Sequence, residues 1–202
     1  MSPTNVQASS TIPGYDYGSE SLPNSPVSVG ELRFLEEATG WTEEDEKWLR
    51  AAAAILSPQA ERIVDSWRGV IASQKELARA FFGPDGRPDD AYKAAVKKRF
   101  VQWVTDACER SHDQQWLDYQ EEIGRRHTPA KKNRTDAVQS APVVPLRYLI
   151  AFSAVICTTI RPFLAQGGRP AEEVQKMQDA WVKSMMLHLA LWARPYVADC
   201  LW

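Results

Sequence analysis

This sequence of 202 residues has few cysteines and almost no net charge, and each shortage excludes a class of protein. The three cysteines, Cys108, Cys157 and Cys200, are odd in number and far apart, which argues against a disulfide scaffold or a zinc finger. They suit a reducing cytoplasm. A net charge of −2 gives no electrostatic basis for binding nucleic acid or an anionic membrane. We therefore expect a cytoplasmic protein with no nucleic-acid partner and no membrane partner.

Targeting signals and uninterrupted apolar runs are also missing. The N-terminal stretch MSPTNVQASSTIPGYDYG has no basic region followed by an apolar run, so it is not a signal peptide. The most apolar stretch, 143–160, contains Arg147 and is followed by Arg161 and Pro162, and a buried helix explains it better than a membrane span. The small basic patch within 131–134 is expected to be a solvated loop.

What the sequence does contain is apolar spacing with the period of an α-helix. Residues 1–27 are rich in Ser, Pro, Gly and Asn and predict an irregular arm; 28–202 predict one domain without β-strands. Helix-start signals and periodic apolar positions place helices at about 28–38, 42–56, 58–72, 74–82, 90–109, 113–127, 143–165 and 170–193. Their unequal lengths indicate crossed helices rather than an even bundle.

Three histidines and eight tryptophans are the residues with the clearest chemical meaning. Large aromatic side chains either fill a core or line a ligand cavity, and both interpretations stay open here. His112 stands in a polar stretch, where it suits a helix start. His127 continues the apolar stripe of 116–123, and His188 continues that of 177–185. Periodicity therefore leaves two candidate ligands, each of which is otherwise a hydrogen-bonded core residue.

The kind of site is narrowed by the motifs that are absent. The sequence has no HExxH, no paired Cys/His spacing, no GxSxG, no P-loop and no GxGxxG. A site that depends on one histidine and a large aromatic cavity suits haem, which needs a single protein ligand to iron and an apolar slot.

Several stretches, in one order along nearly the whole chain, resemble the protoglobins, single-domain relatives of the sensor globins. The matching stretches are IPGYDYG (12–18), KKRF (97–100), DQQWLDYQEEIGRRH (113–127), KKNRTD (131–136), PLRYLIAF (145–152), RPFLAQGG (161–168) and ALWARPYV (190–197). The resemblance implies an all-α, globin-like helical sandwich with an extra N-terminal helix and arm, and haem b as the cofactor. The family's iron-binding histidine ends the motif EIG-x-RH, which makes His127 the metal ligand. The family commonly has glutamine at the position of His188.

The same residue matching implies the other cofactor-binding residues. Trp67, Arg68 and Phe100 are expected on the ligand side of the iron, and Phe152 and Ile156 along the cavity wall. Arg68 departs from the family, which commonly has tyrosine after this tryptophan. A guanidinium is always charged, so it is expected either to reach a haem propionate or solvent, or to contact an iron-bound ligand.

The resemblance implies reversible binding of O2, CO and NO at a His-ligated iron, for gas sensing, scavenging or carriage. One alternative is a haem enzyme that acts on NO, peroxide or carbene-type reagents at the same iron. Another is a haem-free helical interaction module. Related globins pair through their last two long helices, so a homodimer through about 143–165 and 170–193 is expected.

Overall fold

The computed structural model describes residues 12–197 and Trp202; Cys200 and the first eleven residues of the predicted arm lie outside the described residues. Within this part the chain forms nine α-helices and no β-strand beyond an isolated bridge between Phe82 and Pro88. The helices are α1 (Val29–Thr39), α2 (Glu43–Leu56), α3 (Ala60–Ser73), α4 (Lys75–Ala78), α5 (Asp90–Glu109), α6 (Gln114–Arg125), α7 (Leu146–Thr159), α8 (Arg161–Ala165) and α9 (Ala171–Ala193). The predicted all-α class is confirmed.

Helix starts follow the local sequence closely. Ser28 and Glu31 form a capping box at α1, and Thr42 and Asp45 form another at α2. At Ser57-Pro58 the predicted start takes the form of a short 3-10 turn, Ser57–Gln59, which leads into α3.

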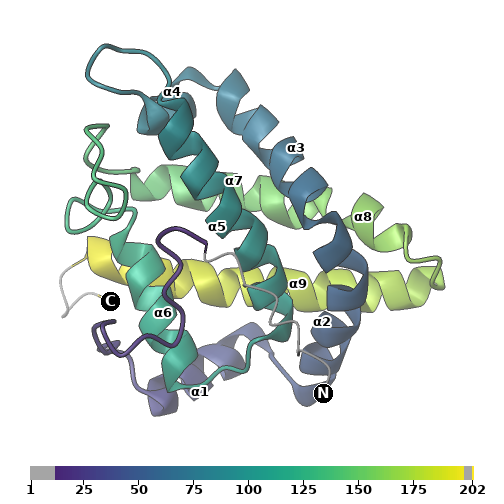
Figure 1. Ribbon diagram of the computed structural model, residues 1–202. Helices are drawn as coiled ribbons and strands as arrows, with labels where there is room; N and C mark the ends of the chain where they lie inside the picture. The colour runs from purple at the N-terminus through teal and green to yellow at the C-terminus, as the bar shows by residue number, and fades with distance from the viewer. Residues whose placement is uncertain (1–11, 198–201) are drawn as a thin grey trace, which may run out of the picture.

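The long helix α9 is the centre of the fold. It contacts α1, α2, α6, α7 and α8, and α5 crosses in front of it in Figure 1. Its buried side includes Met177, Trp181 and Leu187, which are fully enclosed. Trp67 of α3 and Trp103 of α5 pack on the same core, so burial of large apolar side chains holds the crossed helices together.

The segment 143–165 differs from its prediction as one central helix. It is broken at Ile160 into α7 and α8, with Pro162 near the start of α8. Only Ile156 and Cys157 of α7 are buried, and Ile150 is 52% exposed. By length and composition Leu146–Ala165 is apolar enough to cross a membrane, a test that core helices also pass. An all-round apolar helix need not be central when a cavity borders one of its faces.

The described part of the arm lies against α5 and α6, as the purple segment in Figure 1 shows. The phenol of Tyr15 donates to Asp106 of α5 at 2.7 Å, and the rings of Tyr15 and Tyr17 both meet Tyr119 of α6 edge-on. These contacts anchor the arm although it contains no helix before α1.

Candidate functional site

A cavity of about 620 Å³ is lined by residues of α3, α5, α6, α7 and α9, of α4 and the turn after it, and of the loop after α6. This volume falls in the range of small-molecule and cofactor pockets. Its wall is mostly apolar and aromatic. The side chains that line it include Arg68, Tyr92, Arg99, Phe100, Trp103, Arg126, His127, Lys132, Asp136, Phe152, Ile156 and Trp192.

His127 borders this cavity two residues after the end of α6. Its Nδ1 atom lies 2.8 Å from the carbonyl oxygen of Ile123, so Nδ1 carries the proton and donates it. Ile123 has one of the last carbonyls of the helix, which no backbone N–H satisfies. The opposite ring nitrogen, Nε2, has no hydrogen-bond partner among the described residues, and it is the nitrogen available to the cavity.

The protonation of His127 suits a metal ligand. Burial is the main cause that lowers the pKa of His127 to about 4; the charges of Lys132 and Arg126 lower it further, while the bond to Ile123 acts in the other direction. The imidazole is therefore neutral at pH 7, and its Nε2 lone pair is free to coordinate a metal.

Two neighbours fix the His127 ring and backbone. The indole of Trp192 lies 6.0 Å from the imidazole, centroid to centroid, with 27° between the planes, and its Nε1–H donates to Gln120 at 2.9 Å. The phenol of Tyr196 donates to the backbone carbonyls of His127 and Val144. Sequence reasoning identified none of these partners. The contact with Ile123 could have been predicted, because His127 stands four residues after it and the carbonyl of Ile123, near the helix end, needs a donor.

The other residues implied by the resemblance are placed in two layers. Phe100, Phe152 and Ile156 line the cavity from α5 and α7, as does Arg68 from α3. Trp67 does not line it. Its fully buried indole packs 5.4 Å behind the ring of Phe100 and donates to Thr159 Oγ1 at 2.8 Å.

Arg68 borders the cavity with its charge turned toward the protein surface. Its nearest carboxylate is Asp65, at 3.9 Å, and 28% of the Arg68 side chain is exposed. Asp65 is 52% exposed. An ion pair as long and as solvent-exposed as Arg68–Asp65 contributes little to stability, and most N–H donors of the guanidinium are left to hydrogen-bond with water.

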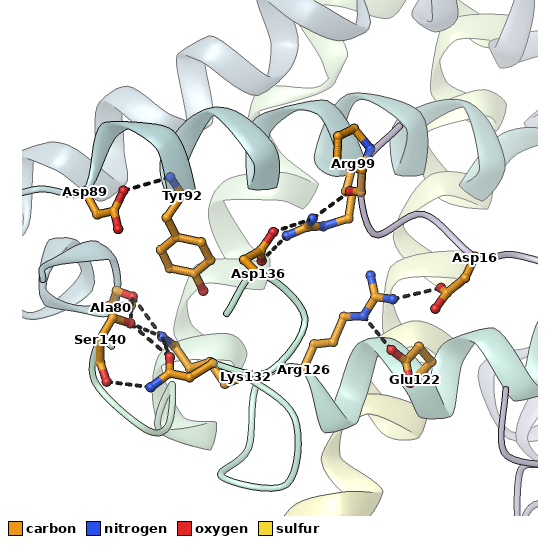
Figure 2. Close-up of polar contacts among 12 residues, drawn as sticks. Asp16, Ala80, Asp89, Tyr92, Arg99, Glu122, Arg126, Lys132, Asp136 and Ser140 are labelled. Carbon is orange, nitrogen blue, oxygen red and sulfur yellow. Dashed lines mark hydrogen bonds and ion pairs between the residues drawn. The ribbon is translucent and has the colours of Figure 1, made fainter. Parts of the chain in front are cut away.

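One edge of the cavity is polar and carries positive charge, as Figure 2 shows. Arg99 forms an ion pair of 2.6 Å with Asp136, and Arg126 is paired with both Glu122 and Asp16 of the arm. All three cations of this edge, Arg99, Arg126 and Lys132, come from the motifs KKRF, EIGRRH and KKNRTD.

The predicted solvated basic loop is therefore wrong for Lys132. Lys132 is 3% exposed, and its ammonium donates to Ala80 O at 2.9 Å and to Ser140 at 2.7 Å (Figure 2). Lys131 pairs with the buried carboxylate of Glu122 at 2.5 Å. Only Arg134 is exposed. Buried carbonyl and carboxylate oxygens require donors, which these lysines supply.

His188 does not border the cavity. It is 1% exposed and its Nδ1 donates to the carbonyl of Ser184, one turn earlier in α9, at 2.7 Å. Within the described residues no group of three or more Cys, His or carboxylate side chains converges to hold a metal ion. The site therefore offers one imidazole nitrogen, not a multidentate metal site.

These features fit a haem group. One neutral imidazole nitrogen supplies the single protein ligand, and the apolar walls supply the slot that a flat macrocycle needs. The arginines at the polar edge have donors that suit the two carboxylates of such a group.

Comparisons with known proteins identify a globin family and a globin fold. The sequence model of the Protoglobin family matches residues 29–201. Among solved structures, the globin domain of the Geobacter sulfurreducens globin-coupled sensor is similar with a TM-score of 0.65 and 15% identity, covering 82% of this chain and 97% of that chain. This likeness shows the fold and confirms the predicted globin-like helical sandwich. No curated protein sequence matches.

Proposed function

This chain belongs to the protoglobin family, and from that premise we propose that it is a haem-b protein whose iron, held by Nε2 of His127, reversibly binds O2, CO and NO. The observation that carries the proposal is the imidazole at the cavity wall, with one nitrogen fixed to Ile123 and the other free. Membership of a globin family implies a haem cofactor; the type of haem, the gases and the ligand are our proposals.

Bound haem supplies an iron atom with one open position for a diatomic gas. The chain itself would hold and orient His127, the residue proposed to bind the iron. Donation from Nδ1 to Ile123 fixes the tautomer of His127, and the parallel indole of Trp192 limits rotation of the ring. Burial keeps the ring neutral, so protons do not compete for Nε2.

The apolar part of the cavity wall would exclude water and admit small apolar molecules. Phe100, Phe152 and Ile156 offer no hydrogen bond to a bound gas. We propose that Arg68 keeps its charge near Asp65 and the surface, and does not contact the gas. We propose that Arg99 and Arg126, which line the polar edge of the cavity, receive the haem carboxylates.

We propose that two copies pair through α7 and α9. One stripe of α7, formed by Arg147, Ile150, Ala151, Ala154 and Thr158, is exposed although the helix is strongly apolar. Met186 of α9 is 36% exposed. A cavity ligand on one face of α7 and a second copy on the other would together cover this helix. A cytoplasmic location is also proposed, since Cys108 and Cys157 are free thiols.

Absorption spectroscopy of the purified protein tests the proposal. We expect a strong Soret band, a shift on reduction, and further reversible shifts when oxygen or carbon monoxide is added and removed. A protein with no Soret band, even after haem is supplied, would be a haem-free helical interaction module instead. Light scattering at several concentrations tests the dimer, and Ile150→Glu is expected to give monomers.

A further inference from the structure

A chain of aromatic rings leads away from the cavity. It begins at His127 and Trp192, whose rings lie 6.0 Å apart with 27° between their planes. The ring of Trp192 is 5.5 Å from that of His188, and His188 is 5.3 Å from Trp116 of α6. Trp192 itself lines the cavity, so the first indole of the chain borders the space assigned to haem.

The same chain continues to the molecular surface. The ring of Trp116 lies 4.2 Å from that of His112, with 33° between their planes, and His112 lies 5.0 Å from Trp41 at a similar tilt of 35°. Trp41 stands between α1 and α2 and is half-buried. Three indoles, each separated from the next by one imidazole, thus connect the cavity to solvent.

Trp103, which also lines the cavity, joins the same chain of rings, because it contacts His188 at 5.7 Å and Trp192 at 5.6 Å. Its other indole contacts are Trp67 and Trp181, at 6.3 and 6.0 Å. Trp67 and Trp181 are fully buried, and their ring contacts within the described residues lead only to other members of this cluster. The branch through Trp116 is the one that reaches a half-buried indole.

A carboxylate lies against the chain of rings. Glu36, 5% exposed, is 2.7 Å from Nδ1 of His112 through one carboxylate oxygen and 2.7 Å from the guanidinium of Arg33 through the other. Because this place is poorly solvated, the carboxylate stabilises a positive charge on the neighbouring rings more than it would in water, and Arg33 compensates part of its charge. The proton pattern at His188 adds to this effect. Its Nδ1 donates to Ser184, so Nε2 is a bare lone pair, and this buried atom has no hydrogen-bond partner among the described residues.

The geometry points to an electron relay: when peroxide is reduced in the haem cavity, Trp192, Trp116 and Trp41 carry the oxidising equivalent to the surface. Indole is among the most readily oxidised side chains, and packed rings couple one indole to the next. His112 and His188 fill the gaps with π-bonded atoms and need not be oxidised themselves. This inference rests on the proposed haem site.

Hydrogen peroxide takes up two electrons and two protons and yields two molecules of water. One electron is drawn from the metal centre and the other from Trp192; the vacancy then moves through Trp116 to Trp41. The Trp41 indole loses its Nε1 proton to solvent, which supplies the second proton as well. A one-electron reductant such as ascorbate returns an electron and a proton to Trp41, and a second equivalent of the same reductant returns the electron drawn from the metal centre and, through solvent, the second proton. Without reductant, dissolved dioxygen adds to the Trp41 ring and oxidises it permanently.

Peptide mapping after peroxide treatment tests the relay. The ferric holoprotein receives a few equivalents of hydrogen peroxide without reductant, and oxygen incorporation at Trp41 is compared with that at Trp48. Trp48 is a half-buried tryptophan of α2 that makes no ring contact with His127, Trp192, His188, Trp116, His112 or Trp41. We expect severalfold more oxidation at Trp41, together with an organic radical in freeze-quenched electron paramagnetic resonance. Trp116→Phe should abolish the preference for Trp41, and Trp48→Phe should leave Trp41 oxidation unchanged.

Equal oxidation of Trp41 and Trp48 in the wild type, or undiminished Trp41 oxidation in Trp116→Phe, would overturn the relay. Should Trp116→Phe fail to fold, Trp41→Phe at the half-buried end serves: the relay predicts faster peroxide bleaching of the Soret band, and an unchanged bleaching rate contradicts it. The ferrous carbonyl spectrum separates the two proposals. Its absence in the wild type removes the haem site and the relay together, whereas a normal carbonyl band without preference for Trp41 removes only the relay.

Discussion

Arg99 and Asp136 tie three separate segments together at the polar edge of the cavity. The guanidinium donates to both carboxylate oxygens, at 2.9 and 2.6 Å, and to the carbonyl of Pro13 in the arm at 2.8 Å. Their side chains are only 11% and 10% exposed. The pair thereby joins α5, the loop after α6 and the N-terminal arm (Figure 2).

Removal of one partner of this pair should be costly. Asp136→Ala leaves the guanidinium of Arg99 poorly solvated and unpaired, which should lower the free energy of unfolding by about 3 kcal/mol. Urea unfolding of the holoprotein measures the change. The double variant Arg99→Met/Asp136→Leu is the control, because it removes both charges and should recover most of the loss. If Asp136→Ala unfolds at the wild-type urea concentration, the pair has no structural role.

Gly124 permits the close approach of α6 and the end of α9. A Cβ atom there would lie 3.1 Å from Pro195 Cγ and 3.2 Å from the Cα of Trp192. Gly124→Ala should therefore push these segments apart and destabilise the protein by roughly 1–3 kcal/mol. Gly69→Ala in α3 is a matched control, because a Cβ atom at Gly69 meets no atom within 4 Å. Thermal unfolding compares the two; equal effects would remove the packing argument.

Arg68 is expected to have little influence on gas release. Its charge lies beside Asp65 and partly in water, so Arg68→Leu should leave the rate of oxygen dissociation nearly unchanged. Stopped-flow mixing of the oxygenated protein with carbon monoxide measures this rate. A marked acceleration would show that the guanidinium donates to bound oxygen.

Lys132 gives the stability of the protein a distinctive dependence on alkaline pH. Burial, partly offset by Asp136, lowers the pKa of Lys132 from 10.5 to about 8. The unfolded chain therefore binds more protons than the folded chain between these values, and stability should rise with pH across this window. Below about pH 8 the Lys132 ammonium stays charged in the folded protein, and its burial lowers the free energy of unfolding by a constant amount.

Lys132→Met should lack this rise, so the difference in unfolding free energy between wild type and variant should change steadily from pH 8 to 10.5. Urea titrations at a series of pH values measure it. Because other lysines and tyrosines titrate in the same range, only the difference between the two proteins is diagnostic. A difference that is independent of pH would mean that Lys132 keeps an ordinary pKa.

Local sequence signals were sufficient for most helices. Ser28 and Thr42 start α1 and α2 as their capping boxes predict, and the periodic residues of 90–109 form α5 with the same limits. These features depend on neighbours within one or two turns, which the sequence displays directly.

Long-range partners were not accessible in the same way. Lys132 can be buried because the carbonyl of Ala80 and the hydroxyl of Ser140 accept hydrogen bonds from its ammonium. Nothing near Lys132 in the sequence indicates Ala80, which is 52 residues earlier. The exposure of one side of α7 could not be predicted either. The apolar composition of the helix does not show which of its sides would be covered by the cavity ligand and which by a second copy. For the site, periodicity left His127 and His188 equal, and the family resemblance favoured His127. The structure adds that His127 borders the cavity and His188 does not.

The visible spectrum of His127→Gly tests the central claim most directly. Wild type and variant are compared as ferrous and ferrous-carbonyl proteins, first without and then with free imidazole. We predict that the variant loses the wild-type bands and that added imidazole, occupying the space of the missing ring, restores them. A variant without imidazole whose ferrous and carbonyl bands match the wild type would show that another group holds the iron.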